Sequence, residues 1–356
     1  MKEYFPFFKR NPEVIYLDSA ATTLRPANYK QHRDLTVHRS CYPDSTVAFE
    51  AVRSSVNTFL RSFEKDTIFT SGATESMNVI ARGLKYQYGD NVVLSGLEHN
   101  SSYAPWLRCP YLDVRTTPLT AEGEVNVKLL FENVDENTRA IIVTSVCNVT
   151  GTEAPLSEIY EQSSDIPVIL DASQSIAHSI PQHYDLCIFS AHKMYGPTGV
   201  GVIHGDLSNF EPLKAGSSAV REIRNGQLIW SETPHESGTP NIDGVLDFAN
   251  TLYFVSFLPS VVFLPYLIAG LRTIPRVEIY PKHEVGLVSF NVAGYNAYDV
   301  AEDLVKNNIY VRAGRHCADL VFESLPCEET VRVSLGVYNN VQDIDYFIAV
   351  MRKLYR

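Results

Sequence analysis

Most features that would place this sequence in a membrane, in an oxidising compartment or on nucleic acid are absent from it. The six cysteines form no CxxC pair and no zinc-ligand spacing, which predicts free thiols in a reducing compartment and no metal site. The net charge is -11 and no clustered basic segment is present, so a nucleic-acid partner is not expected. The chain of 356 residues also has no internal repeat, low-complexity tract or long linker.

Long apolar runs are also scarce. The first residues, MKEYFPFFKRNPEV, carry no sustained apolar run behind their charges, so we expect neither a secretory signal nor a membrane anchor and predict a cytoplasmic protein. One uncharged stretch, residues 252–269, approaches the length of a membrane span. We interpret it as a buried helical element broken by Pro259 and Pro265, because the chain has no other membrane feature.

What the sequence does contain is an alternation of apolar, β-rich runs with helical patterns. The runs look like strands buried on both faces, so the alternation predicts an α/β fold with a mostly parallel sheet. The predicted strands are residues 66–70, 91–95, 140–146, 166–171, 186–189 and 199–204. Between the strands, residues 48–63 form an apolar helical stripe that would pack on the sheet, made of Phe49, Val52, Val56, Phe59, Leu60 and Phe63.

The pattern of the sequence changes after about residue 271. The segments there are typical of a smaller α+β unit that closes with a helix from about Val341. With 45% hydrophobic residues, the chain can bury one large core and a smaller companion. We therefore predict a large domain over residues 14–270 and a small C-terminal domain over residues 271–356, with residues 1–13 packing on the small domain.

The segment TSGATESMNVIARGL, residues 70–84, follows a predicted strand and opens a helix. Backbone N–H groups at Gly72, Ala73 and Thr74, the helix dipole and the Thr74 hydroxyl would converge there on an anion, and a phosphate fits. The alternative is an ordinary helix capped by serine or threonine, and this segment alone does not decide between the two.

Two further strand ends carry candidate side chains. VILDASQS contains Asp171 at the carboxyl end of a strand, where parallel sheets form their ligand crevice. A carboxylate there could hold a ring nitrogen protonated, or it could cap a following helix. LEHNSSYAPW places His99 after another strand, where its flat imidazole could stack on a flat cofactor, although a single histidine is more often an ordinary core or surface residue.

Lys193 connects these features. It lies in FSAHKMYGPTGVG, residues 189–201, between a histidine and a glycine-rich turn. A lysine made nucleophilic by its surroundings can form a Schiff base with an aldehyde. Such a lysine, a carboxylate for a ring nitrogen and a phosphate-binding helix terminus together are what pyridoxal 5'-phosphate requires. The sequence therefore predicts an enzyme that uses this cofactor.

The chain resembles the class V, fold-type I pyridoxal-phosphate enzymes over nearly its whole length. Within that class it looks most like the SUF-type cysteine desulfurases, which are close relatives of the selenocysteine lyases. The resemblance implies a fold-type I α/β large domain, a small α+β domain and a homodimer as the active unit. The matching motifs occur in the expected order: YLDSAATT, SGATESMNVIARGL, LEHNSSYAPW, CNVTGT, VILDASQSIAH, FSAHKMYGPTGVG, ESGTPN, VRAGRHCADL and VRVSLGVYN.

The resemblance also implies a role for each matching position. Lys193 would hold the cofactor covalently and then shuttle protons, while Asp171 would pair with the pyridine nitrogen. His99 would stack on the ring. Arg332 would clamp the substrate carboxylate as a planar bidentate donor, with Arg312 near the substrate. The remaining implied contacts are Ala73, Thr74, Ser190 and His192 at the phosphate, Gln174 and Asn148 at the phenolic oxygen, and Thr239 at the phosphate of the neighbouring subunit.

Cys317, in VRAGRHCADL, matches the thiol that attacks the substrate sulfur in a cysteine desulfurase. Nearby Arg312, Arg315 and His316 would favour the thiolate if their side chains face the sulfur. Arg315 stands where SUF-type enzymes often have a second histidine. Cys327, in the loop ESLPCEET, is a candidate sulfur relay, although an incidental surface cysteine is the simpler interpretation.

These inferences predict conversion of L-cysteine to L-alanine, with the sulfur carried as a persulfide on Cys317 into iron–sulfur cluster assembly or another sulfur-transfer pathway. A sulfur-acceptor protein is a candidate partner, whereas Cys41 and Cys187 are interpreted as packing residues. A class V aminotransferase, or a selenocysteine or carbon–sulfur lyase without a catalytic thiol, is the first alternative. A non-catalytic, cofactor-binding scaffold is the second. Compared with the family, the chain lacks much of the helical link expected after about residue 250.

Overall fold

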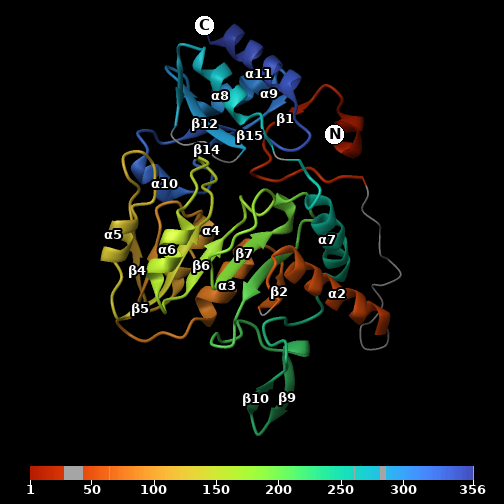
Figure 1. Cartoon of the computed structure of the whole chain (residues 1–356), viewed down its shortest axis with the longest axis vertical. Coiled ribbons are helices and arrows are strands. Elements are labelled where there is room, and N and C mark those ends of the chain that lie inside the picture. Colours follow the sequence, from red (N-terminus) through yellow and green to blue (C-terminus); the bar gives the residue numbers. More distant parts are fainter. Residues whose placement is uncertain (28–42, 64, 260, 281–285, 356) are drawn as a thin grey trace.

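The computed structural model describes residues 1–27, 43–63, 65–259, 261–280 and 286–355. A large layered unit built on a central sheet carries a smaller unit that contains the C-terminal helix (Figure 1). None of the helices in the described ranges combines the length with the apolar composition that a membrane span requires. The architecture confirms the predicted α/β fold with a smaller α+β part.

The central sheet has seven strands in the order β2-β8-β7-β6-β5-β3-β4. The five strands from β7 to β4 run parallel, whereas β8 is antiparallel to both β2 and β7. Every residue of β3, β6, β7 and β8 is buried, which accounts for their continuous apolar sequences. The strands are β2 (Asp66–Thr70), β3 (Asn91–Leu94), β4 (Asp113–Thr116), β5 (Thr138–Thr144), β6 (Val168–Asp171), β7 (Leu186–Ser190) and β8 (Gly201–Gly205).

Three strands that the sequence did not predict contain no buried residue. β4 has the sequence DVRT, lies at the sheet edge and contains no buried residue. β9 (Val220–Arg224) and β10 (Gln227–Trp230) form an antiparallel hairpin, preceded by the short helix η5 (Ser217–Ala219), that projects away from the sheet (Figure 1). Strands without a buried face give no periodic apolar signal, so the sequence did not predict them.

Helices cover both faces of the large sheet. On one face, α3 (Ala73–Gly83) shares a hydrophobic core with the sheet through Met77 and Ile80. On the other face, α2 (Pro43–Phe59) and α7 (Ile242–Val255) share a core with β7 and β8, while α5 (Val127–Glu132) and α6 (Leu156–Ser163) cover β3 and β5. This three-layer arrangement leaves the ends of the parallel strands as the edge where side chains from several strands meet.

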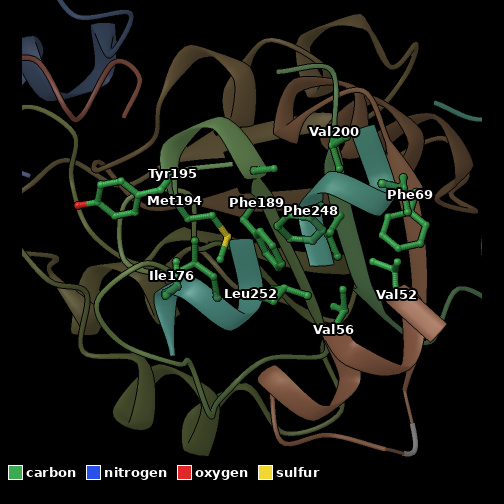
Figure 2. Close-up of a cluster of buried hydrophobic side chains, with 14 of the residues drawn as sticks. Val52, Val56, Phe69, Ile176, Phe189, Met194, Tyr195, Val200, Phe248 and Leu252 are labelled. Atoms are coloured by element: carbon green, nitrogen blue, oxygen red, sulfur yellow. The ribbon is translucent and has the colours of Figure 1, made fainter. Parts of the chain in front are cut away.

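The core under α2 and α7 anchors the chain around Lys193. Met194 and Tyr195, which follow this lysine directly, are buried in the same cluster as Phe189 and Phe248 (Figure 2). Full burial of a large apolar side chain stabilises the fold by about 2–3 kcal/mol. The backbone that carries Lys193 is therefore held by packing on both sides of the turn.

The helical stripe predicted over residues 48–63 is confirmed in part. Phe49, Val52, Val56 and Leu60 are buried in this core, but Phe63 is 74% exposed, so its assignment to the stripe is wrong. The helix ends at Phe59, and Arg61, with φ of 55°, turns the chain out of the helical path before Phe63.

The smaller unit is an antiparallel sheet in the order β11-β12-β15-β14 with helices packed on it. The parallel pair β1 (Ile15–Tyr16) and β13 (Ile309–Tyr310) brings Ile15 and Leu17 into the same core. The other elements are β11 (Val277–Ile279), β12 (Leu287–Val292), β14 (Arg312–Gly314), β15 (Thr330–Ser334), α8 (Leu264–Arg272), α9 (Ala297–Val305), α10 (Asp319–Ser324) and α11 (Val341–Leu354). The N-terminal η1 (Lys2–Tyr4) and α1 (Pro6–Arg10) precede them, and Phe5 and Phe8 pack on Tyr338. The domain boundaries at residues 14 and 271 stay a prediction.

The uncharged stretch 252–269 forms the end of α7, a connecting segment and most of α8. Pro259 lies in the connection, as expected for a helix-breaking residue, but Pro265 lies in the first turn of α8 and does not break it. Proline is tolerated there because the first N–H groups of a helix have no intrahelical partner. The stretch is also less buried than predicted, since Tyr253 and Phe257 are each 72% exposed.

Candidate active site

The residues of the candidate site collect at the carboxyl ends of four adjacent parallel strands. Glu98 and His99 follow β3, Asn148 follows β5, Asp171 ends β6 and Ser190 ends β7. These strands are neighbours in the order β7-β6-β5-β3, so the side chains that follow them lie along one edge of the sheet. That edge is where open α/β sheets bind ligands.

Lys193 closes η4 (Ala191–Lys193), the single helical turn that directly follows β7. Burial lowers the pKa of its ammonium group, and this favours the neutral amine that can act as a nucleophile. Asp171 and Cys317 oppose that shift electrostatically, whereas Arg332 and Arg312 add to it. The four side chains therefore lie close enough to Lys193 to interact with its charge.

Asp171 is 4% exposed and its carboxylate is oriented by two hydrogen bonds. Ser102 Oγ donates to Oδ2 at 2.7 Å, and the Ser173 backbone N–H donates to Oδ1 at 2.9 Å. Residues 173–178 form turns rather than an α-helix, so Asp171 does not cap a helix. A buried, oriented carboxylate beside a lysine is what a protonated ring nitrogen would require.

His99 is the N-cap of α4 (Asn100–Tyr103), and its Nδ1 accepts from the Ser101 backbone N–H at 3.1 Å. Burial, followed by the nearby Lys193 charge, lowers the pKa of His99 to about 4. The imidazole is therefore neutral at physiological pH, with its ring fixed by the cap. Its stacking on a cofactor ring stays a prediction.

The expected phosphate cradle lies between α3 and the end of β7. Ser190 Oγ accepts from the Ala73 backbone N–H at 2.8 Å, so this hydroxyl stands at the N-terminus of α3. A Cβ on Gly201 would lie 2.4 Å from Gly72 Cα, so β8 requires glycine to approach this turn. Thr74 is exposed on the first turn of the helix, where the dipole favours an anion.

Of the other implied cofactor contacts, His192 and Gln174 lie near Lys193, whereas Thr239 lines a different cavity. His192 Nδ1 lies 3.2 Å from Thr22 Oγ1, and burial lowers the pKa of His192 to about 4. Gln174 lines a small cavity with Lys193, and its Nε2 donates to the Ala20 carbonyl at 2.9 Å. Thr239 is exposed and lies apart from Lys193, in a cavity of about 550 Å³ that also includes side chains from the start of α3.

Arg332 and Arg312 come from the smaller unit and face the same site. They are register partners on β15 and β14. Arg332 is 2% exposed. Its Nη1 donates to the Asn148 backbone carbonyl and its Nη2 donates to Asp18 Oδ1, both at 2.9 Å. Arg332 Nε and Asn148 Oδ1 are buried without a hydrogen-bond partner among the described residues. Two such polar atoms at one place fit a polar ligand that would satisfy them.

Cys317 is exposed and lies in the loop between β14 and α10. Both His316 and Cys317 have positive φ, 51° and 55°, a conformation that costs of order 1 kcal/mol per residue and needs support from its surroundings. Asn148 Nδ2 donates to the His316 carbonyl at 2.9 Å, and the Asn100 backbone N–H donates to the Cys317 carbonyl at 2.7 Å. The loop is thus held against the large sheet.

The expectation that Arg315 and His316 promote the thiolate is wrong. Arg315 Nε pairs with Asp319 at 2.5 Å, so its charge is compensated. His316 is buried with Nε2 2.9 Å from Thr330 Oγ1, and burial lowers its pKa to about 2, so it is neutral. Neither side chain therefore supplies the positive charge that was expected at the Cys317 sulfur.

The five cysteines in the described ranges are all free thiols, as predicted. Cys187 is buried in the core, which confirms its packing assignment, whereas Cys41 lies outside the described residues. Cys327 is half-buried beside Tyr280, and burial raises the pKa of its thiol. A raised pKa disfavours the thiolate, so the structure supports packing rather than sulfur relay at Cys327.

Three residues of the site were missed by sequence reasoning. Asp18, Glu98 and Ser102 lie within the motifs YLDSAATT and LEHNSSYAPW, but nothing in the sequence pairs Asp18 with Arg332, 314 positions away. Glu98 follows an apolar strand and reads as a surface residue, yet it is fully buried. Its carboxylate accepts from Ser95 Oγ, Thr144 N and Thr144 Oγ1, each at 2.7 Å.

Glu98→Gln is expected to stabilise the protein above pH 7 and not below pH 5. Burial raises the pKa of Glu98 to about 7 despite its three hydrogen bonds. When folding raises the pKa of a carboxyl group, the free energy of unfolding falls as the pH rises from the pKa in the unfolded chain to the pKa in the folded protein. For Glu98 this loss amounts to about 3 kcal/mol in all. Glutamine carries no charge, so thermal melts from pH 4.5 to 8 should show its advantage growing with pH. Glu122→Gln, at an exposed position, is the control, and parallel melting curves for the two variants would contradict the expectation.

Comparison with known proteins assigns this geometry to a family. The model of the family Aminotransferase class-V matches residues 15–347. This is nearly the whole chain, and the protein belongs to the class V aminotransferases, a family of pyridoxal-phosphate-dependent enzymes. Within that class it groups with the cysteine desulfurases, as its relatives show.

The similarity to cysteine desulfurases spans both sequence and structure. The cysteine desulfurase of Dickeya dadantii (strain 3937) is 32% identical over 380 residues, covering 96% of this chain and 92% of that protein. That of Escherichia coli O139:H28 is 30% identical and covers 99% and 97%. The crystal structure of the cysteine desulfurase CsdA from Escherichia coli matches with a TM-score of 0.90 at 28% identity, covering 99% of this chain and 96% of that one. The apo cysteine desulfurase of Thermococcus onnurineus NA1 matches with a TM-score of 0.88 at 28% identity, covering 99% and 97%. The predicted family, fold class and type of enzyme are confirmed.

Proposed function

We propose that this protein is a pyridoxal 5'-phosphate-dependent cysteine desulfurase that converts L-cysteine to L-alanine and transfers the sulfur to Cys317 as a persulfide. The observation that carries the proposal is that Asn148 and Asn100, at the edge of the large sheet where Asp171 and Lys193 lie, bind the loop of Cys317, and that Arg332 donates to the Asn148 carbonyl at the same place. Asp171 ends β6, Lys193 closes η4, Arg312 and Arg332 lie on β14 and β15, and Cys317 lies in the loop after β14. An amine, a carboxylate, a guanidinium pair and a thiol together match the needs of this reaction.

The residues present fit the cofactor. Lys193 would bind it covalently, Asp171 would pair with its ring nitrogen, and His99 would cover one ring face. Ser190, Ala73, Thr74 and His192 would surround the phosphate, and Gln174 and Asn148 would approach the phenolic oxygen. When bound, pyridoxal phosphate supplies a sink for the electrons released at the substrate Cα.

The chain's own side chains would do the remaining work. Arg332 would hold the substrate carboxylate through its guanidinium plane, and Lys193 would carry the proton removed from Cα. The Cys317 thiolate would form an S–S bond with the substrate sulfur while the Cβ–S bond breaks. The electron pair of that bond would stay on carbon, which takes up a proton at Cβ and leaves as alanine.

We further propose a homodimer in the cytoplasm that passes sulfur to an acceptor protein, with iron–sulfur cluster assembly as a candidate pathway. The dimer is supported by Thr239, which is exposed and so accessible to a second copy of the chain, as the resemblance to the family implies for this threonine. Size-exclusion chromatography with light scattering would reveal the dimer directly.

One assay separates this function from its alternatives. The purified protein is incubated with L-cysteine or L-selenocysteine, and alanine, sulfide and selenide are quantified. Alanine and sulfide from L-cysteine support the desulfurase, whereas activity with selenocysteine alone, or with amino-group transfer instead of sulfur release, favours a lyase or an aminotransferase. A protein that binds the cofactor and forms no product would be a scaffold, although each catalytic piece predicted for the family is present.

Arg332→Lys is expected to raise the apparent KM for L-cysteine about tenfold or more, with a smaller effect on kcat. A buried lysine keeps the positive charge but loses the planar, two-pronged geometry, and a hydrogen bond to a charged group is worth about 1.5–3 kcal/mol. Steady-state kinetics measures both constants. Arg139→Lys is the matched control, because Arg139 also pairs with an aspartate, Asp90, at 2.6 Å but lies outside the site. An unaltered KM in Arg332→Lys would exclude carboxylate clamping as the task of Arg332.

A further inference from the structure

The short helix α4 contacts three parts of the candidate site. Its N-cap is His99, the Asn100 backbone N–H reaches the Cys317 carbonyl, and Ser102 Oγ lies 2.7 Å from Asp171 Oδ2. The Ser102 side chain is fully buried, and its own backbone N–H donates to the His99 carbonyl at 2.8 Å. The helix turn therefore fixes the position of Ser102, and burial keeps water from replacing its hydroxyl as the donor to Asp171.

We propose that Ser102 is a positioning residue for Asp171, because its hydroxyl donates to this carboxylate and holds it toward the ring nitrogen of the cofactor. The inference rests on the proposed function, which gives Asp171 that nitrogen as its partner. An ionised carboxylate only accepts hydrogen bonds, so the 2.7 Å contact has the serine as donor. A hydrogen bond to the charged form of a buried carboxylate favours that form.

The two oxygens of Asp171 depend on different donors. Oδ1 accepts from the Ser173 backbone N–H, a bond that no side-chain substitution at residue 173 removes. Oδ2 accepts from the Ser102 hydroxyl, and within the described residues this is the protein donor found for that oxygen. Losing the hydroxyl would leave a charged oxygen buried with one donor fewer. The proton shared by the carboxylate and the ring nitrogen would then lie more on the carboxylate. The ion pair would become less populated, and the pair of neutral groups would become more populated.

Ser102→Ala is the test, and its main readout is the visible absorption of the holoenzyme as a function of pH. A positive charge on the ring nitrogen opposes a second positive charge on the nitrogen that joins the cofactor to Lys193. With the ring less protonated, that linking nitrogen keeps its proton to higher pH, so the midpoint of the absorption change should shift upward. We also expect kcat for L-cysteine to fall about tenfold with KM changed less than twofold, because substrate contacts are untouched. Asp171→Asn should shift the midpoint in the same direction and lose most turnover while retaining cofactor.

Ser163→Ala is the matched control. Ser163 is also a buried serine on a short helix, α6, and its hydroxyl donates to the Tyr160 carbonyl at 2.9 Å, far along the chain from the site. It should match Ser102→Ala in melting temperature but leave the absorption midpoint and kcat unchanged. An unshifted midpoint in Ser102→Ala overturns the inference even if the variant is less stable. If wild-type protein forms no visible band with pyridoxal phosphate, the proposed function fails and this inference fails with it.

Discussion

Lys193→Ala is expected to abolish the borohydride-reducible bond to pyridoxal phosphate and to reduce turnover by about four orders of magnitude. The lysine is proposed both to bind the cofactor and to carry the Cα proton, so one substitution removes two functions. Its lowered pKa, caused first by burial, makes the neutral amine available for both tasks. The measurement is borohydride reduction followed by mass spectrometry of the peptides, together with alanine formation from L-cysteine.

Lys65→Ala provides the matched control for this experiment. Burial also lowers the pKa of Lys65, but this lysine contacts the Tyr184 ring and carbonyl rather than the candidate site. The control should retain the reducible bond and its activity. A reducible bond at full occupancy on another residue of Lys193→Ala would show that the lysine is wrongly assigned.

Cys317→Ala is expected to retain bound cofactor and to bind L-cysteine, yet to lose alanine formation by roughly 10³-fold, because the nucleophile of the transfer step is gone. The thiol is exposed in a loop that Asn148 and Asn100 hold toward the large sheet. With L-selenocysteine we expect a smaller loss, since the weaker carbon–selenium bond depends less on nucleophilic attack. Cofactor absorption and product assays on the same preparation separate a binding defect from a chemical one.

Cys327→Ala is the control for the thiol. Cys327 is half-buried with a raised thiol pKa, and its loss should leave alanine formation near the wild-type rate. Alanine production that survives in Cys317→Ala would favour the lyase alternative. A loss of activity in Cys327→Ala comparable to that in Cys317→Ala would restore the relay hypothesis.

The architecture of the large unit was predictable because its strands are buried on both faces. A run such as NVVL or VILD has no polar face, so its apolar sequence reports burial directly. The ends of these apolar runs also predicted that His99 and Asp171 lie at strand ends. Apolar runs did not predict β4, β9 and β10, because the residues of these strands are partly or wholly exposed and their pairing depends on neighbours elsewhere in the chain.

The identity of the candidate site residues was more predictable than their interactions. Motifs point to Lys193 and Arg332, but the sequence does not indicate that Arg332 is balanced by Asp18. The orientation of Arg315 and His316 was likewise open, and tertiary contacts with Asp319 and Thr330 turn both away from the role predicted for them. Glu98 was missed because a single acidic residue after a strand gives no sign that three donors surround it.

Mass spectrometry after brief exposure to L-cysteine, without a reductant, shows whether Cys317 receives the substrate sulfur. Wild-type protein is digested and the peptides carrying Cys317 and Cys327 are compared for an added sulfur atom. We expect the added sulfur on the Cys317 peptide, in step with the release of alanine. Sulfur found only on the Cys327 peptide, or on neither peptide while alanine is still produced, would contradict it.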